Sequence, residues 1–216
     1  MSFREICLFE KIREKINLYG WRIALLVSVK AFMRKFFAFT WDKYCLMVRE
    51  TDDLPLLDFG KFQVRDLSIS DYENELWEPS FLNEEKKKLY VKRFANPNAK
   101  AYGVIVDGEL AYSTWILYGE VIIQNRFRYP LSNKVALLLD SYTHPKYRGM
   151  GLHNYMNVWR LYKMKEKGVE KVFGVVLSYN RPAIKTQTKS GLRVVDRFYI
   201  FGFGNKKWCT LKKIPI

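Results

Sequence analysis

The first fifty residues place apolar side chains at helical spacing. Five of them recur three or four positions apart: Phe3, Ile6, Phe9, Ile12 and Ile16. This spacing predicts an amphipathic helix over residues 3–18, which Gly20 ends. Residues 21–39 are apolar and contain no acidic side chain, and they predict a second helix. We therefore expect residues 1–50 to form an N-terminal helical arm.

The remaining pattern alternates between strands and helices after a polar, turn-rich joint at residues 52–60. Strands are expected at residues 62–69, 101–106, 110–117, 121–127, 135–143, 171–177, 192–203 and 208–211. Helices are expected at residues 81–94, 151–167 and 181–190, and Ser70–Asp71 predicts the start of a short one. Asp107–Gly108 lies between two β-rich runs and predicts a hairpin turn.

This order of elements predicts the fold class. Strands alternating with helices imply parallel pairing, and the hairpin adds antiparallel strands. We expect an α/β (α+β) domain over residues 61–216, with a central mixed sheet flanked by helices and the helical arm preceding it.

Charge is unevenly distributed along the chain. The net charge is +15, and residues 144–216 alone carry sixteen basic and three acidic side chains. Such an excess is either a solvated basic face or a surface for a polyanion such as a nucleic acid, an anionic membrane or a phosphate-rich cofactor. No recognisable nucleic-acid-binding module is present, so we expect no specific nucleic-acid partner.

The cysteines and the apolar runs bear on location. The three cysteines, Cys7, Cys45 and Cys209, are widely spaced and odd in number, which favours a reducing compartment, and we expect a cytoplasmic protein. No cleavable signal and no run of about 20 apolar residues is recognisable. The helix over residues 21–39 either packs on the rest of the protein or lies in a membrane interface, which would make the protein membrane-peripheral.

The segment with the clearest chemistry joins the strand 135–143 to the helix 151–167. It reads Thr143-His144-Pro145-Lys146-Tyr147-Arg148-Gly149-Met150-Gly151-Leu152-His153. Two glycines at the start of a helix allow backbone N–H groups to approach an anion, and two cations add charge. The spacing matches neither a Walker loop nor a dinucleotide fingerprint. The segment predicts a phosphate or pyrophosphate site, and its alternative interpretation is a simple turn into a helix.

Two stretches of the sequence resemble the GNAT superfamily of N-acyltransferases. The run from Asp140 to Gly151 resembles its acyl-CoA-binding motif. The run from Leu177 to Ile184, which closes with Lys189-Ser190-Gly191-Leu192, resembles its second signature. Val64-Arg65-Asp66-Leu67, followed by Asp71, looks like the usual opening strand and helix start. The resemblance covers about residues 61–205.

The resemblance implies a GNAT-like fold and transfer of an acyl group, most simply acetyl, from acetyl-CoA or another acyl-CoA to an amine. The implied acyl-CoA-binding residues are Tyr142, Thr143, Lys146, Arg148, Gly149, Met150, Gly151, Leu152, His153 and Asn180. The implied chemistry needs a general base, an oxyanion donor and an acid for the thiolate. Our catalytic candidates are Asp140 as base, with Tyr142 and Tyr179 as substitutes for an acid, and Glu120 is a second candidate base.

Two positions depart from the family pattern. Gln187 stands where many members have a Tyr that protonates the thiolate, and Gln cannot donate a proton to sulfur. His153 stands where many members have Gly or Ala. The two histidines of the chain, His144 and His153, have no cluster of ligands around them in the sequence, and we expect no metal site.

Three hypotheses follow from the sequence. The first is an acyl-CoA-dependent N-acyltransferase with an unidentified amine acceptor, for which an amino-sugar or lipid intermediate at a membrane is one option. The second is a non-catalytic basic protein that binds an anionic membrane or nucleic acid. The third is a GNAT-like domain that binds coenzyme A without turnover, which the glutamine at Gln187 keeps open.

Overall fold

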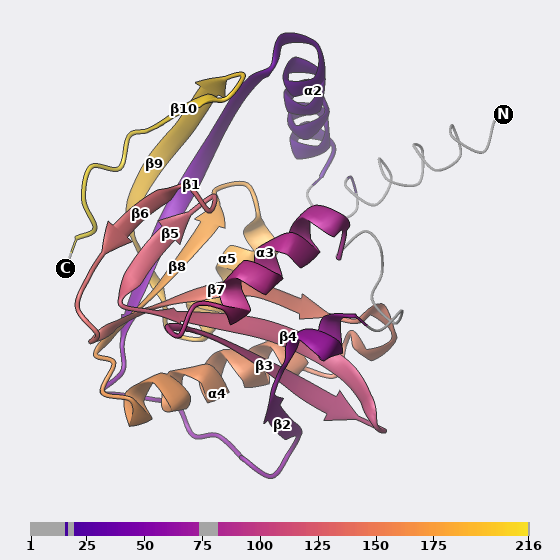
Figure 1. Ribbon diagram of the computed structural model, residues 1–216, viewed down its shortest axis with the longest axis vertical. Helices are drawn as coiled ribbons and strands as arrows, with labels where there is room; N and C mark the ends of the chain where they lie inside the picture. Colours follow the sequence, from indigo (N-terminus) through magenta and orange to yellow (C-terminus); the bar gives the residue numbers. More distant parts are fainter. Residues whose placement is uncertain (1–15, 17–19, 74–81, 216) are drawn as a thin grey trace, which may run out of the picture. The chain divides into compact units, whose positions relative to one another are not determined.

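The computed structural model describes residue 16 and residues 20–73 and 82–215 (Figure 1). The main sheet has eight strands in the hydrogen-bonded order β10-β9-β1-β8-β7-β4-β3-β2. The chain forms two compact units. Of the described residues, unit 1 contains those up to Met47, those of Val175–Thr188 and those from Val194 onward, and unit 2 contains those of Val48–Gly174 and Lys189–Arg193.

Unit 1 begins with a helix that is followed directly by a long strand. Helix α2 covers Trp21–Phe37 and strand β1 covers Phe39–Glu50. The other elements of this unit are the end of β8 (Lys171–Leu177), α5 (Arg181–Lys189), β9 (Arg193–Phe203) and β10 (Lys206–Cys209). Tyr44 of β1 stacks on Phe198 of β9 at 5.5 Å between ring centroids, and Lys30 of α2 forms a buried ion pair with Asp42 of β1 at 2.9 Å.

The strand β1 corrects the expected helical arm. The helix over residues 21–39 is confirmed as α2, whereas Phe39–Glu50 is a strand of the main sheet. The expected helix over residues 3–18 lies outside the described residues. The stretch from Phe39 to Val48 is rich in aromatic and β-branched side chains, which favour strands, but the expected helical arm over residues 1–50 includes it.

Unit 2 contains the antiparallel part of the sheet and its first parallel pair. Its strands are β2 (Gln63–Asp66), β3 (Ala99–Val106), β4 (Glu109–Tyr118), β7 (Val135–Thr143) and the start of β8. β7 pairs with β4 antiparallel and with β8 parallel. The predicted mixed sheet is therefore confirmed, and the predicted bounds of the strands 135–143 and 171–177 agree with β7 and β8.

Helices cover both faces of this sheet (Figure 1). On one face lie α3 (Glu84–Phe94) and the 3-10 turn η1 (Ile69–Tyr72), whose aromatic rings surround Trp115 of β4. On the other face lies α4 (Leu152–Glu166), where His153 contacts Tyr112 of β4. Tyr112 and Trp115 point to opposite faces because their separation in the strand is odd.

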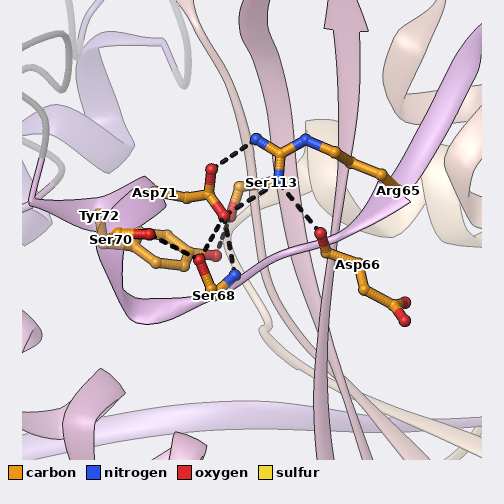
Figure 2. Close-up of polar contacts among 7 residues, drawn as sticks. All are labelled: Arg65, Asp66, Ser68, Ser70, Asp71, Tyr72 and Ser113. Carbon is orange, nitrogen blue, oxygen red and sulfur yellow. Dashed lines mark hydrogen bonds and ion pairs between the residues drawn. The ribbon is translucent and has the colours of Figure 1, made fainter.

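Two local predictions in unit 2 were wrong. The expected strand over residues 121–127 is a hairpin of β5 (Glu120–Ile123) and β6 (Phe127–Pro130), with its turn at Gln124 and Asn125. The N-cap of η1 is Ser68, not Ser70. The Asp71 carboxylate accepts hydrogen bonds from the Ser68 N–H at 2.8 Å and from the Arg65 guanidinium at 2.5 Å and 3.0 Å (Figure 2).

Candidate functional site

The candidate site is the segment between β7 and α4, which we call the glycine loop (residues 144–151). Its first part is a 3-10 turn, η2, at Pro145–Tyr147. Tyr147 is buried, and its N–H donates to the His144 carbonyl at 2.9 Å. Leu152, the first residue of α4, is 1% exposed. Buried side chains at both ends therefore fix the loop, while Arg148, Gly149, Met150 and Gly151 between them are exposed.

The two glycines give the loop an open backbone. Gly149 has φ 88° and Gly151 has φ 80°, a left-handed conformation that side chains with a Cβ disfavour. A Cβ at either position would meet no atom within 4 Å. Gly151 is the N-cap of α4, no side chain caps the helix, and its first turn contains no acidic residue. The first N–H groups of a helix have no partner within it, so this end suits an anion.

The charges beside the loop are partly neutralised. Lys146 Nζ lies 2.7 Å from Glu109 Oε2, and the Tyr147 hydroxyl donates to the same carboxylate. The hydrogen bond from Lys146, followed by that from Tyr147, lowers the pKa of Glu109, and the same contact raises the pKa of Lys146. Arg148 Nε donates weakly to the Thr143 carbonyl at 3.4 Å. Of the two cations that the sequence predicts for this site, Lys146 and Arg148, it is therefore Arg148 that has no acidic partner among the residues that the structure describes.

Just before the loop, β7 contains a bulge. Ser113 of β4 lies opposite Tyr142 and Trp115 lies opposite Leu139, so Thr114 faces both Asp140 and Ser141. Asp140 adopts φ 39°, which is rare for a residue with a side chain. An extra residue of this kind leaves the ladder locally unpaired and turns the strand. The bulge therefore changes the direction of Tyr142 and Thr143, which the resemblance assigns to acyl-CoA binding.

Ion pairs hold the bulge from the α3 face. Arg93 of α3 donates to Asp140 Oδ2, and Lys86 Nζ lies 4.0 Å from Asp140 Oδ1. The Arg93 guanidinium lies 5.5 Å from the ring centroids of Tyr90 and of Trp115. Asp140 is thus an ion-paired carboxylate, and to accept a proton from a substrate it would have to weaken these contacts.

A buried arginine holds the bulge from the α4 face. Arg160 is 1% exposed. It donates to Thr114 Oγ1 at 2.5 Å and to Asn157 Oδ1, and Thr114 Oγ1 lies 3.0 Å from Ser141 Oγ. No carboxylate pairs with it in the part of the chain that the structure describes, and burial lowers the pKa of Arg160. A buried cation with neutral partners is costly, so the network around Ser141 depends on its hydrogen bonds.

A second hydroxyl pair lies on the α3 face of the bulge. The Tyr72 hydroxyl lies 2.6 Å from Ser113 Oγ, and both side chains are buried (Figure 2). Ser113 lies opposite Tyr142 in the strand register. Burial raises the pKa of Tyr72, which keeps its hydroxyl protonated. The capped turn η1 therefore positions a hydroxyl beside the strand segment that precedes the loop.

His153 faces the sheet rather than the loop. Its Nδ1 lies 3.2 Å from the Tyr112 hydroxyl. Burial, and secondly the charge of Arg160, lowers the pKa of His153 to about 4. The ring is neutral at physiological pH, so its predicted role in acyl-CoA binding is limited to the backbone N–H at the start of α4.

The remaining candidates lie elsewhere. Tyr179 and Asn180 belong to unit 1. Lys30 Nζ lies 5.3 Å from the Tyr179 ring centroid. The Asn180 side chain accepts a hydrogen bond from the Ala183 N–H at 3.2 Å, at the start of α5. Gln187 Oε1 is buried without a hydrogen-bond partner among the described residues. Glu120, the second candidate base, is ion-paired with Arg128 at 2.9 Å.

Three residues of this site escaped the sequence analysis: Glu109, Arg93 and Arg160. Each contacts a residue 37 to 47 positions away in the chain, and a spacing of that length carries no periodic signal. Arg160 could have been noticed because it stands on the apolar face of the predicted helix, between Met156 and Met164.

The fold is shared with known acetyltransferases, although no protein-family model and no curated protein matches the chain. An acetyltransferase of the GNAT family from Colwellia psychrerythraea aligns with a TM-score of 0.55 at 15% identity, over 82% of this chain and 61% of that one. A conserved protein of unknown function from Staphylococcus epidermidis gives 0.56 at 13% identity, over 79% and 64%. A tandem GNAT protein from the clavulanic acid biosynthesis pathway gives 0.52 at 17% identity, over 76% and 54%.

These likenesses show that the chain has the GNAT fold, as the sequence resemblance implied. The chain spans less than two thirds of each of these three proteins.

Proposed function

We propose that the protein is an acyl-CoA-dependent N-acyltransferase, most simply an acetyltransferase that uses acetyl-CoA. The observation that carries the proposal is the open glycine loop at the start of α4, directly after the bulged end of β7, in a chain with the GNAT fold. A simple turn into a helix needs neither two left-handed glycines nor an exposed backbone between buried ends.

The residues of the loop fit the pyrophosphate of coenzyme A. The N–H groups from Gly149 to Leu152 would bind phosphate oxygens at the helix N-terminus, and Arg148 would add a charge-assisted contact. Tyr142 and Thr143 would bind the pantetheine arm through their backbone groups, as the resemblance implies. When bound, acyl-CoA supplies an activated acyl group in its thioester.

The proposed reaction forms a C–N bond between an acceptor amine and the acyl carbon and breaks the C–S bond. The amine loses a proton to a base, and the thiolate gains one from an acid or from water. We keep Asp140 as a candidate base and Tyr142 and Tyr179 as candidate acids. Because Asp140 is ion-paired on the α3 face, its first task in this proposal is to hold the bulge.

Calorimetry with acetyl-CoA tests the loop assignment through two matched variants. Gly151→Trp and Gly108→Trp replace glycines with φ 80° and 79°, and both positions are open. Both variants therefore carry a similar strain of about 1 kcal/mol. We expect Gly151→Trp to lose at least 20-fold in affinity and Gly108→Trp to bind as the parent does. Equal affinity in the two variants would contradict the assignment.

Release of free thiol from acetyl-CoA in the presence of an amine panel tests the transfer step. We expect amine-dependent release that Gly151→Trp abolishes. Tight binding of acetyl-CoA with no release for any amine would instead support the non-catalytic alternative that Gln187 keeps open.

We propose as a second role that unit 1 contacts an anionic membrane surface. Trp21, Leu25, Val29, Phe32 and Phe36 follow one exposed stripe of α2, which we call the α2 stripe. Residues 20–47, 175–188 and 194–215 carry twelve basic and two acidic side chains, and one of these acids, Asp42, is buried against Lys30. Exposed aromatic side chains beside basic ones are typical of interfacial helices. No described helix is long and apolar enough to cross a membrane.

A further inference from the structure

A cavity of about 260 Å³ lies on the α3 face of unit 2, bordered by α3, the sheet and the β5–β6 hairpin. Its apolar lining consists of Leu89, Ala99, Leu117, Ile122 and Leu139. Its polar lining consists of Lys92, Arg93, Asn96, Asn125 and Arg128. An apolar surface with a few converging polar groups is typical of a small-molecule site.

The charge of the cavity is positive. No acidic residue lines it, whereas Lys92, Arg93 and Arg128 do. Two nearby carboxylates reduce this charge, because Arg128 pairs with Glu120 and Arg93 pairs with Asp140. Lys86 shares Asp140 with Arg93, and Lys92 has no ion pair among the described residues. Among the described residues, the three cations of the lining therefore stand against two neighbouring acids, which leaves a net positive lining for an anion.

The β5–β6 turn contributes an amide to this lining. Gln124 and Asn125 have φ 52° and 54°, and this left-handed pair closes the hairpin tightly. The Asn125 side-chain oxygen lies 3.5 Å from Arg93 Nη2. The hairpin therefore forms a wall of the cavity and adds an amide group, which can donate to an anion.

The cavity adjoins the bulge of β7. Leu139, which lines the cavity, is the residue directly before Asp140. Arg93 lines the cavity and also binds Asp140. A ligand in the cavity would therefore lie on the α3 face, next to the strand segment that leads into the glycine loop.

We propose that this cavity binds the anionic end of the acceptor: an amine that carries a carboxylate or a phosphate, separated from its nitrogen by a short apolar part. The apolar lining takes the body of the molecule, the cations of the rim bind its anion, and the amine points toward the bulge. The inference rests on the proposed acyl transfer for the role of the amine, but not for the binding of the anion.

Calorimetry without acyl-CoA tests the binding with two matched pairs of probes. 4-Aminobutanoate is compared with 4-aminobutanamide, and O-phosphoethanolamine with ethanolamine; the members of each pair differ by one anionic group. In at least one pair we expect the member that carries the anionic group to bind at least 10-fold more tightly than the member that lacks it. The pair that shows the difference identifies the anion as carboxylate or phosphate. No preference in either pair would overturn the proposal.

Variants locate the site. We expect Lys92→Gln to lower the affinity for the anionic probe about five-fold, whereas Lys92→Arg keeps the affinity of the parent. The double variant Lys92→Gln/Arg128→Gln is expected to lose at least 10-fold in affinity. Lys87→Gln is the matched control. This substitution removes the same charge from α3, but Lys87 does not line the cavity. An equal loss in Lys87→Gln would assign the effect to net charge and overturn the site.

Acetyl-CoA binding, measured separately, distinguishes the two proposals. If acetyl-CoA binds and transfer is as fast to amines that lack an anionic group as to amines that carry one, the cavity proposal is wrong and the acyltransferase proposal stands. If acetyl-CoA does not bind but 4-aminobutanoate or phosphoethanolamine binds in a Lys92-dependent way, the cavity is a ligand site and acyl transfer is wrong.

Discussion

Single side chains of the site are set by partners that are distant in sequence. The sequence predicted an anion site in the glycine loop, because the glycines and cations of the loop are close neighbours in the chain. It could not predict that Lys146 pairs with Glu109 or that Asp140 pairs with Arg93, since these contacts exist only after β4, β7 and α3 pack together. The pattern predicted candidate residues for the chemistry, but it could not predict how much of their charge is neutralised by other side chains.

The Glu109–Lys146 pair gives a testable consequence at the loop. Glu109→Gln removes the carboxylate that neutralises Lys146 and leaves a shape close to the original. We expect acetyl-CoA to bind two- to five-fold more tightly at low salt, with a difference that shrinks as salt screens the charge. Calorimetry at two salt concentrations measures this. An unchanged or weaker affinity at low salt would place Lys146 away from the phosphates.

His153 gives a pH-dependent stability. Its pKa is lowered from 6.5 to about 4 by burial, so the unfolded chain takes up a proton that the folded protein refuses between these values. The contribution of neutral His153 to the free energy of unfolding is fully present above pH 6.5. It is lost as the pH falls to about 4, and the loss is at most about 3 kcal/mol.

Denaturant unfolding of the parent and of His153→Gln at pH 7.0 and pH 4.5 measures this contribution. We expect the stability difference between the two pH values to be smaller in the variant, since other groups titrate equally in both proteins. The same pH dependence in both would show that His153 is not buried against Tyr112.

At the scale of elements, the sequence predicted regular segments well and interruptions poorly. The bounds of β7 and β8 were correct because both are continuous apolar runs between turn residues. The β5–β6 hairpin was read as one strand because its turn, Gln124–Asn125, lacks the glycine that usually marks such a turn. The bulge at Asp140 was invisible for a related reason, since nothing in an apolar strand pattern marks a residue with φ 39°.

Two substitutions of Asp140 test the bulge. Both remove the ion pair with Arg93, but Ala keeps the strain of the left-handed backbone and Gly relieves it. We expect Asp140→Gly to be more stable than Asp140→Ala by about 1 kcal/mol. In a regular strand the order is reversed, because glycine is then the less favourable residue. Chemical denaturation decides between them, and a more stable Ala variant would mean that no bulge forms there.

At the scale of the whole molecule, the two units differ in net charge and in exposed aromatic side chains. The glycine loop, the bulge and the cavity all belong to unit 2. The described part of unit 1 carries the larger excess of basic residues and the α2 stripe. The net charge of +15 is compatible with a solvated basic face or with a polyanion partner, and composition alone could not decide between them.

Vesicle co-sedimentation tests the membrane contact. Phe32 and Phe36 are 53% and 62% exposed, so replacing both by Ser changes little of the core. We expect the double variant to bind vesicles of phosphatidylglycerol at least five-fold more weakly than the parent. We expect neither protein to bind vesicles of neutral phosphatidylcholine. Equal binding by both proteins, or a change of oligomeric state in the variant alone, would contradict a lipid-facing α2 stripe.

The most direct test of the central claim is a titration of the ¹⁵N-labelled protein with acetyl-CoA, followed by backbone amide chemical shifts. We expect the largest and earliest changes at Arg148, Gly149, Met150, Gly151 and Leu152, and we expect them to persist when the salt concentration is doubled. Unchanged amides in the loop, with small salt-sensitive changes spread over the lysines of residues 163–171 and 206–213, would show that acetyl-CoA binds only to the general positive charge of the protein.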